Sequence, residues 1–419
     1  MPTPREKAPD PDLGYRSIDK VRYLSPEFAA REWERVFERC WLYAVPAADV
    51  AEPGSFATYD IGPESVIIAR TPEGELDAFY NVCQHRGRRL VEAPCGRANA
   101  FRCKYHAWTY RLDGSVRTIL DREVFPEDLD PATLTIPRVR VDTWGGLVWI
   151  CFDLDGPSLT EFLGVIPDHL SCYPLERYAL VDDQSVRWDC NWKIAMDAFH
   201  ESYHTLGTHP QMMEYVADTN VQIDCYGRHS RFLMPWGAPA PRIKARSTPN
   251  KSQAEYFAAY GFDVSTFEGT ADDAYLEFQR RKRDWMLERG YELEDLDLSQ
   301  FSDVCSYTVF PNIQLALAAD RCLLTRHRPD PRDPTRMIFD AQSFAHVPPG
   351  EAWPERPATR KGAGLDFAYA PDFVAQDAVN APAIQRGMAS KGFRGSVLGD
   401  LELRIRHFHH VLDGYMETA

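Results

Sequence analysis

The sequence predicts an α+β fold in two parts, an antiparallel β domain followed by a larger domain of mixed helices and strands. A chain of 419 residues is long for one hydrophobic core, so two domains are the expected arrangement. Short strand patterns bounded by turn residues fill residues 43–155, whereas helical and strand patterns mix over residues 156–419. We therefore place one domain at each of these ranges, with residues 1–42 as a segment that packs on the second domain.

Composition and charge describe a soluble protein. Hydrophobic residues make up 44% of the chain and charged residues 26%, as in ordinary globular proteins. The formal net charge of −15 argues against a surface that binds nucleic acids or anionic membranes. The first residues lack the apolar segment of a signal peptide, no run of about 18 apolar residues occurs, and the 10 cysteines show no disulfide spacing. We therefore expect a cytoplasmic protein without a membrane span.

A helix is expected near the N-terminus, beginning at Ser25 and Pro26. Serine is favoured at the N-cap and proline at the first helical position. In the stretch that follows, EFAAREWERVFERCW, the apolar residues Phe28, Trp33 and Val36 recur on roughly one face. This face predicts a helix that docks on a hydrophobic core.

The β domain is predicted from apolar strand patterns separated by turn sequences. The turns are Pro-Glu-Gly at residues 72–74 and Asp-Gly at residues 113–114. Short strands joined in this way are typical of an antiparallel sheet. The expected strands are residues 65–70, 75–81, 107–112 and 145–154.

The second domain is predicted from longer periodic segments. Helical patterns cover residues 159–170 and the segment from Trp192 to Leu206, and strand patterns cover residues 306–319 and 336–347. Between residues 237 and 300, proline-rich and acidic stretches predict loops and surface helices.

Four residues of metal-binding type lie at short spacings in the β domain. Cys83 and His85 form a Cys-x-His pair, and Cys103 and His106 form a Cys-x-x-His pair. Two thiolates and two imidazoles can hold one zinc ion, although Cys-x-His is unusually close for a zinc pair. They also suit a [2Fe–2S] cluster in which two cysteines bind one iron and two histidines bind the other. Cys95 has no partner in this pattern and is interpreted as an ordinary cysteine.

The sequence around these pairs resembles a known family. The stretches FYNVCQHRGRRL and FRCKYHAWTYRLDG are similar to the Rieske domain of the Rieske non-haem iron oxygenases, the α-subunit type of ring-hydroxylating oxygenase. The preceding segments RCWLYAV and PGSFATYDIG are similar to the usual approach to that domain. The resemblance implies that the four residues bind a [2Fe–2S] cluster. It also implies a helix-grip-like catalytic domain with a mononuclear iron after the Rieske domain.

The sequence HESYH has the form His-Glu-x-x-His that is found in zinc proteases. In that interpretation His200 and His204 share a helix face and bind zinc, with Glu201 as the base. The longer version of the motif requires a third histidine at the position of Pro210, and His209 comes one residue early. This mismatch argues against a protease.

A second interpretation of the segment uses Glu201, His204 and His209. Two histidines and a distant carboxylate form the facial triad of non-haem iron(II) oxygenases. The preceding NWK and the spacing acid-x-x-His-x4-His resemble the same oxygenase family. The resemblance implies that both histidines bind mononuclear iron and that Glu201 is the bridge for electron transfer from a neighbouring subunit. The chain departs from most members in having glutamate at the bridge, and from many in having Asp197-Ala198 where those carry Glu-Asn.

The third iron ligand is expected late in the chain. The sequence FVAQDAVNAPAIQRGMAS, residues 373–390, resembles the family's C-terminal helix, which implies Asp377 as the ligand. Asp372 is the alternative and is interpreted as a cap at the start of the helix. The histidines of residues 404–415 are interpreted as packing and surface residues, and His200 is not expected to be a ligand.

These features together resemble the terminal oxygenase component of a Rieske system. The resemblance implies electrons from NAD(P)H, delivered through a ferredoxin or flavin reductase, and a homotrimer with or without a β subunit. An apolar aromatic or alicyclic substrate is expected, hydroxylated or cis-dihydroxylated with O₂, as in aromatic hydrocarbon catabolism. The candidate pocket residues are Ala198, Phe199, Leu206 and Gln314.

Three alternatives stay open at this point. The same chemistry serves a Rieske monooxygenase that removes O- or N-methyl groups. A Rieske electron carrier without catalysis needs only the first four ligands and gives no reason for the set at positions 201, 204, 209 and 377. A zinc protease is the most distant alternative.

Overall fold

The protein is described by a computed structural model that covers residues 6–243, 246–364 and 372–417. The chain divides into two compact units, of which the first, the β unit, is Trp33–Phe162. The second, the mixed unit, is formed by Met1–Glu32 together with Leu163–Ala419. The segment expected at residues 1–42 is therefore divided, because it joins the mixed unit only as far as Glu32.

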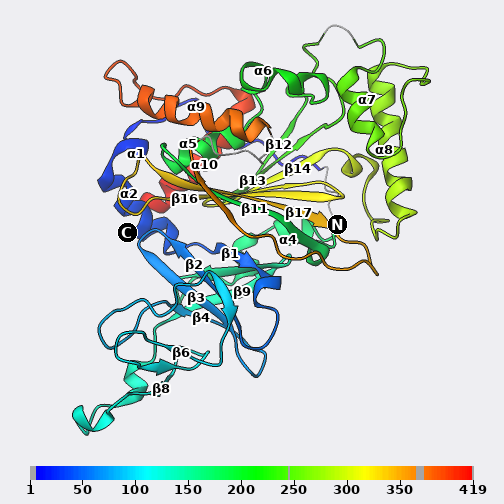
Figure 1. The fold of residues 1–419 in the computed structure, drawn as a ribbon. Helices are drawn as coiled ribbons and strands as arrows, with labels where there is room; N and C mark the ends of the chain where they lie inside the picture. The colour runs from blue at the N-terminus through cyan, green and yellow to red at the C-terminus, as the bar shows by residue number, and fades with distance from the viewer. Residues whose placement is uncertain (1–5, 244–245, 365–371, 418–419) are drawn as a thin grey trace. The chain divides into compact units, whose positions relative to one another are not determined.

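The β unit contains two antiparallel sheets, drawn in blue to cyan in Figure 1. Its seven-stranded sheet has the order β1-β10-β9-β4-β3-β2-β5, and its three-stranded sheet has the order β6-β7-β8. This confirms the predicted antiparallel β domain. The strands are β1 (Leu42–Pro46), β2 (Ser55–Ile61), β3 (Glu64–Arg70), β4 (Leu76–Tyr80), β5 (Cys95–Arg97), β6 (Phe101–Arg102), β7 (Thr109–Tyr110), β8 (Val116–Thr118), β9 (Arg138–Trp144) and β10 (Leu147–Cys151).

The core of the β unit brings the first metal-ligand candidates into a rigid setting. Cys83 and Cys103 belong to the same buried cluster as Phe56, Phe79 and Phe101. The ring of Phe101 meets the edges of the other two rings at centroid distances of 5.4 and 5.9 Å. Because close-packed aromatic rings leave little freedom, the backbone that carries both cysteines is fixed by the core.

The mixed unit is built on one eight-stranded sheet in the order β12-β13-β14-β15-β16-β17-β11-β18. All neighbours are antiparallel except β11 and β18, which are parallel. The segment expected as one strand at residues 306–319 is a hairpin, because the chain turns at Phe310-Pro311 between β14 and β15. The strands are β11 (Tyr178–Trp188), β12 (Gln222–Tyr226), β13 (His229–Met234), β14 (Val304–Val309), β15 (Ile313–Leu317), β16 (Arg321–Pro329), β17 (Met337–His346) and β18 (Arg360–Ala363).

Helices α5, α9 and α10 pack on this sheet and on one another. Helix α5 contacts β16 and β17, α10 contacts β12 and β13, and α9 contacts α5. Figure 1 shows α9 in orange beside α5 in green, although the two are far apart in the sequence. The α-helices of this unit are α1 (Val21–Leu24), α2 (Pro26–Glu32), α4 (Ile166–His169), α5 (Trp192–Phe199), α6 (Thr205–Thr208), α7 (Lys251–Ala258), α8 (Ala271–Leu287), α9 (Asp372–Met388) and α10 (Leu403–Glu417).

The N-terminal helix docks on α5 through a buried ion pair. Helix α2 begins at Pro26, as expected, and continues as a π-helix (Trp33–Phe37). The ammonium of Lys193 on α5 lies 2.7 Å from a carboxylate oxygen of Glu32, and both side chains are almost completely buried. Burial is costly for either charge alone, so each holds the other in place.

The region expected to hold loops and surface helices at residues 237–300 contains α7 and α8 with a small core of their own. Phe257, Phe262 and Phe278 are fully buried in this cluster. Sequence reasoning did not find the cluster, because proline and acidic residues obscure the helical pattern. Within the described part of the chain, no helix combines the length and the apolar character that crossing a membrane requires.

Two candidate metal centres

Two loops of the β unit, residues 83–88 and 103–108, close in the same way. In each loop the backbone N–H of the cysteine donates to the carbonyl of the last loop residue at 2.8 Å. The carbonyl of the cysteine accepts from the backbone N–H of the second-to-last loop residue, at 2.9 Å in one loop and 3.0 Å in the other. Those accepted donors are Gly87 and Ala107, with φ angles of +74° and +59°. A positive φ turns the chain back on itself. The two sequence motifs are therefore one loop structure used twice.

Each loop presents one cysteine and one histidine. The side chains of Cys83 and Cys103 are buried, and the rings of His85 and His106 lie 4.5 Å apart between centroids. The Nδ1 atoms of both histidines are buried, and neither has a hydrogen-bond partner among the described residues. Beside two buried cysteines on the same loops, these unpaired nitrogens fit ligands that bind a metal through Nδ1.

The surroundings of the loops orient these donors. The ring of His85 stacks on Trp108 at 4.8 Å. The hydroxyl of Tyr110 lies 3.4 Å from Sγ of Cys83 and accepts a hydrogen bond from the N–H of Gln84 at 2.9 Å. Burial raises the pKa of the Cys83 thiol, so the thiolate form needs a bound cation to be stable there.

The four donors are too widely spread for one tetrahedral ion. Donor atoms around a single zinc ion lie within about 4 Å of one another. In the described ranges, the only group of three or more such residues whose donor atoms all lie within 4.8 Å is His204, His209 and Asp377. The donors of the β unit are less compact, and two separate irons suit them better. The residues present therefore fit a [2Fe–2S] cluster.

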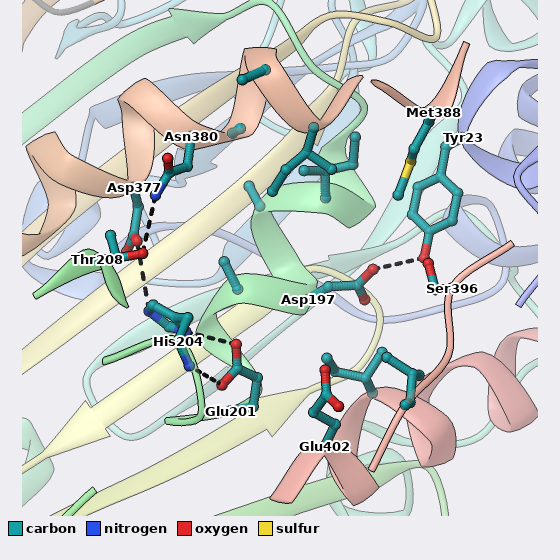
Figure 2. Close-up of a pocket in the computed structure, with 18 of the residues that line it drawn as sticks. Tyr23, Asp197, Glu201, His204, Thr208, Asp377, Asn380, Met388, Ser396 and Glu402 are labelled. Carbon is teal, nitrogen blue, oxygen red and sulfur yellow. Dashed lines mark hydrogen bonds and ion pairs between the residues drawn. The ribbon is translucent and has the colours of Figure 1, made fainter. Parts of the chain in front are cut away.

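The mixed unit brings His204, His209 and Asp377 together at one point. The Nε2 atoms of the two histidines are 3.1 Å apart. Oδ1 of Asp377 lies 3.2 Å from Nε2 of His209 and 3.6 Å from Nε2 of His204. Figure 2 shows Asp377 on α9 facing His204. Three donors that converge on one face and leave the other side open fit a mononuclear iron(II) ion.

A second layer of contacts fixes the orientation of both rings. Glu201 lies 2.6 Å from Nδ1 of His204 through Oε1, and Gln376 lies 2.7 Å from Nδ1 of His209 through Oε1. Because these oxygens accept hydrogen bonds, each Nδ1 carries the proton and each Nε2 presents its lone pair to the site. Sequence reasoning missed Gln376, although its position directly before Asp377 was a usable signal.

The segment that carries these residues is not the single helix expected from Trp192 to Leu206. Helix α5 ends at Phe199, and α6 begins only at Thr205. The carboxylate of Glu201 accepts a hydrogen bond from the backbone N–H of His204 at 3.0 Å, which replaces a helical bond with a side-chain bond. The break turns His204 and His209 toward each other.

Contacts of α9 with α6 and with the 3-10 helix that follows it (Pro210–Glu214) set the distance to the third donor. The amide of Asn380 donates to the hydroxyl of Thr208 at 3.0 Å, as Figure 2 shows, and Gln211 donates to Gln376 at 2.8 Å. These bonds lie on either side of Asp377 along α9. The helix is therefore held at two points against the segment with the histidines.

Charges around the site affect His204. Burial alone would lower its pKa, but the hydrogen bond and charge of Glu201, with the charge of Asp377, raise it above the ordinary value. The same cluster of carboxylates attracts a divalent cation in place of the proton.

His200 does not join the site. Its side chain is fully buried, its ring nitrogens have no hydrogen-bond partner among the described residues, and its ring lies 5.0 Å from that of Phe408. Burial lowers its pKa well below the ordinary value. The zinc-protease interpretation required His200 and His204 on one helix face, and the end of α5 separates them.

A histidine of the C-terminal helix holds the aspartate that departs from the family pattern. The hydroxyl of Tyr23 donates to Asp197 at 2.7 Å, and Nε2 of His409 lies 3.2 Å from the same carboxylate. Arg22 donates to Nδ1 of His409 at 3.0 Å, so the imidazole carries its proton on Nε2, between the Tyr23 hydroxyl at 2.9 Å and Asp197. His409 was interpreted only as a packing or surface residue.

Two cavities open beside the triad. One, of about 450 Å³, is lined by Ala198, Phe199 and Gln314 together with His204, His209 and Asp377. The other, of about 490 Å³, is drawn in Figure 2, with Glu201, Asp197 and Tyr23 among its lining residues. Both cavities include Glu201, His204 and Asp377.

The structure does not place Leu206, one of the expected pocket residues, at either cavity. Leu206 lines neither cavity and is 50% exposed. On the short helix α6, the buried residue is Thr205, which lines the apolar cavity of about 450 Å³. Because neighbouring residues of a helix point in different directions, Leu206 faces away from the site.

Two family models match this chain. The Rieske [2Fe-2S] domain matches residues 40–126, and the ring hydroxylating alpha subunit (catalytic domain) matches residues 175–418. The second match covers more than half of the chain. The protein therefore belongs to the family of ring-hydroxylating oxygenase α subunits, with a Rieske domain before the catalytic domain, and the resemblance noted in the sequence is confirmed.

Three individual relatives are similar to part of this chain, at identities of 27% to 32%. The chain is 30% identical over 200 residues to the glycine betaine monooxygenase oxygenase subunit of Chromohalobacter salexigens, which is 48% of this chain and 44% of the relative. It is 27% identical over 269 residues to the carnitine monooxygenase oxygenase subunit of Acinetobacter pittii, which is 63% of this chain and 71% of that relative. It is 32% identical over 191 residues to the large oxygenase component of the naphthalene 1,2-dioxygenase system of Pseudomonas aeruginosa, covering 44% and 42%. The matches thus span less than half the length of two of these relatives.

Solved structures share the fold over almost the whole chain. A quaternary ammonium Rieske monooxygenase superposes with a TM-score of 0.73 at 19% identity, covering 98% of this chain and 100% of the other. Naphthalene 1,2-dioxygenase with indole bound in its active site gives a TM-score of 0.70 at 18% identity, covering 99% and 95%. Together with the two family models, these likenesses in fold confirm the expected Rieske β domain followed by an α/β catalytic domain.

Proposed function

We propose that this protein is the terminal oxygenase component of a Rieske system that hydroxylates a small organic substrate with O₂. The convergence of His204, His209 and Asp377 in a chain that also carries the paired Cys–His loops supports this proposal most strongly. An electron carrier without catalysis has no use for the triad or for the cavity beside it. A binding protein without redox chemistry has no use for the loops.

The residue roles follow from the donor sets. Cys83, His85, Cys103 and His106 would hold the [2Fe–2S] cluster, and His204, His209 and Asp377 would hold the mononuclear iron(II). When bound, these groups supply single electrons and an open position for O₂. The chain itself keeps the proton of each iron-site histidine on Nδ1, through Glu201 and Gln376.

Glu201 is the proposed bridge for electron transfer from a neighbouring subunit. It contacts His204 directly and lines both cavities, so it links the triad to a second opening in the mixed unit. The change Glu201→Gln keeps an amide oxygen that can accept from Nδ1 of His204 but removes the charge. Both metals should stay bound. The Rieske cluster should still be reduced by the electron donor, but product formation should fall. An unchanged rate would remove Glu201 as the bridge.

The proposed partners are those of the family. A ferredoxin or flavin reductase would pass on electrons from NAD(P)H, and a homotrimer, with or without a β subunit, would bring a Rieske domain to each triad. A cytoplasmic location suits both the free cysteines and the supply of NAD(P)H.

The proposed oxygenase has two possible forms, one that hydroxylates or dihydroxylates a ring compound and one that is a monooxygenase acting as a demethylase. The cavity is lined largely by apolar side chains, including Phe199, Phe232, Trp236 and Phe344, which suits a ring compound and dihydroxylation or hydroxylation. The second candidate, a monooxygenase that also acts as a demethylase, is favoured by the similarity to oxygenase subunits of glycine betaine and carnitine monooxygenases.

Product mass after turnover with ¹⁸O₂ tests the proposal. The holoenzyme is combined with a ferredoxin, a reductase and NADH, and is offered aromatic, alicyclic and N-methyl compounds. A diol with two labelled oxygen atoms identifies a dioxygenase, and one labelled atom, with or without release of formaldehyde, identifies a monooxygenase. No labelled product from any compound, with both metals present and reducible, would contradict the proposed function.

A further inference from the structure

A polar side chain in the wall of the apolar cavity, Gln314 of β15, has one end of its amide fixed by a buried arginine. Arg404 of α10 donates through Nη2 to Oε1 of Gln314 at 3.1 Å and to the hydroxyl of Thr308 at 2.6 Å. Thr308 donates to the same amide oxygen at 3.2 Å. Arginine has only donors, so the amide atom beside it must be the oxygen. The Nε2 donor therefore occupies the other end of the amide.

That donor has no partner in the described protein. Gln314 is 2% exposed, and its Nε2 is buried without an acceptor among the described residues. The side chain lines the cavity that also contains His204, His209 and Asp377. A buried N–H without an acceptor is unfavourable, so this position favours a ligand that brings an oxygen acceptor.

The arginine behind Gln314 is a buried cation with neutral partners. Its remaining hydrogen bonds go to the hydroxyl of Ser230 at 3.2 Å and to the backbone carbonyl of His200 at 3.5 Å. Burial lowers the pKa of Arg404 to about 9, and only Cys225 and Cys305 oppose this effect. The field of the guanidinium is therefore not cancelled by a nearby carboxylate, and it makes the Gln314 side of the cavity positive.

The rest of the cavity lining fits this separation of charge. The carboxylates of Glu201 and Asp377 lie with the metal-binding histidines, whereas Arg321 at the start of β16 adds a second cation to the lining. The charge of neighbouring Asp320 partly offsets that of Arg321, although Asp320 is also bound by Lys282 at 2.6 Å and by Tyr260 at 2.6 Å. A substrate with an electron-rich oxygen finds its complement on the sheet side of the cavity.

We propose that Gln314, oriented by Arg404, is a specificity-determining residue that donates a hydrogen bond to a carbonyl or carboxylate oxygen of an otherwise apolar substrate. The proposal rests on the proposed function, which makes this cavity the substrate site. It refines the expectation of a purely apolar ring compound. Sequence reasoning placed Gln314 at the pocket but gave no role to its amide, because the contact with Arg404 joins residues 90 positions apart.

Equilibrium binding of three matched probes to the holoenzyme tests this. The probes are 2-methylnaphthalene, 2-acetylnaphthalene and 2-naphthoate, which share a ring system and differ in the oxygen acceptor. Wild type should bind at least one oxygenated probe more tightly than the hydrocarbon. Gln314→Leu should lower the affinity for that probe by roughly tenfold to a hundredfold. The affinity for 2-methylnaphthalene should stay within about twofold of the wild-type value. A larger loss for 2-naphthoate assigns the carboxylate, and a larger or equal loss for 2-acetylnaphthalene assigns the carbonyl.

Two further variants separate recognition from folding. Gln314→Glu keeps an oxygen for Arg404 and turns a second acceptor to the cavity, so it should fold normally and lose 2-naphthoate binding by roughly a hundredfold. Gln222→Leu makes the same change on β12, outside both cavities, and should leave all three affinities unchanged.

Equal losses for all three probes, or wild-type binding of the hydrocarbon at least as tight as that of both oxygenated probes, would overturn the role of Gln314. If the predicted binding pattern holds but no labelled product forms with ¹⁸O₂, the oxygenase proposal fails while the recognition role stands. The two failures are thus distinguishable.

Discussion

The two candidate metal centres use histidine in opposite ways. In the β unit, Nδ1 of His85 and His106 is buried and unpartnered among the described residues, so Nδ1 is the nitrogen left for a metal. In the mixed unit, Nδ1 of His204 and His209 is occupied by Glu201 and by a glutamine, so Nε2 is left. The surrounding hydrogen bonds therefore decide which nitrogen binds, and they can be read before any metal is present.

The centres also differ in how the chain assembles them. The donors of the β unit come from two copies of one local loop, closed by backbone hydrogen bonds. The triad needs α6 and α9, whose residues Thr208 and Asn380 touch at a sequence separation of 172. The loops of the β unit should keep their structure when a distant residue is substituted, because their hydrogen bonds are local. The triad depends on contacts between elements that are far apart in the sequence. Each variant below is chosen to break or to sharpen this contrast.

The largest effect is expected for the change Asp377→Ala. It removes the only donor of the triad that comes from α9, so mononuclear iron and turnover should both fall below detection while the Rieske absorption spectrum is retained. Asp372→Ala is the matched control at the exposed start of the same helix and should keep both metals. Iron analysis and visible absorption measure the outcome. Full turnover of the Asp377 variant would remove it as a ligand.

The converse loss is expected for Cys103→Ser. A hydroxyl is a poor substitute for a thiolate on iron, so the cluster and its absorption should disappear while mononuclear iron remains. Cys95→Ser provides the comparison, because Cys95 is an exposed cysteine on β5 outside both loops. Loss of the cluster in the Cys95 variant would show that the donor set is assigned wrongly.

A smaller effect is expected for Gln376→Leu. The change leaves Nδ1 of His209 without its acceptor, so the ring is free to turn, and iron affinity should fall by roughly tenfold to a hundredfold. Titration of the metal-free protein with iron(II) measures this. Gln211→Leu removes only a contact to Gln376 and should cost less. If Gln376→Leu binds iron as tightly as wild type, the outer contact does not control the triad.

The smallest effect is expected for Tyr110→Phe. The Tyr110 hydroxyl lies against Sγ of Cys83, and hydrogen bonds to cluster sulfurs stabilise the reduced form. The variant should keep its cluster and have a lower reduction potential in a redox titration. Tyr105→Phe serves as the control, since the Tyr105 hydroxyl accepts from Arg86 and not from a cluster ligand. An equal potential in wild type and Tyr110→Phe would show that this bond does not tune the cluster.

The sequence predicted the elements of this account unevenly, and the reasons are physical. The β domain and the four residues of its loops were visible because strand alternation and loop closure are local. The triad was visible through spacing at His204 and His209 and through resemblance at Asp377. The break between α5 and α6 was missed, because the helical pattern continues through residues 200–204 while the Glu201 carboxylate takes over the backbone N–H of His204.

Contacts between distant segments were beyond sequence reasoning. Nothing in the sequence near Gln314 indicates that Arg404 fixes its amide, and nothing near Asp197 indicates that Tyr23 and His409 hold its carboxylate. Such partners are set by the packing of α1 against α9 and of α10 against the sheet. A single sequence offers periodicity and spacing but not these pairings.

The ratio of iron to inorganic sulfide in the purified protein, before and after mild chelation, tests the two-centre account most directly. The account predicts about three irons and about two sulfides per chain, with about one iron removed by the chelator and restored by added iron(II). The sulfide content and the Rieske spectrum should not change in that cycle. A ratio of about two irons to two sulfides that added iron(II) cannot raise, or zinc in place of iron at the cysteines, would contradict it.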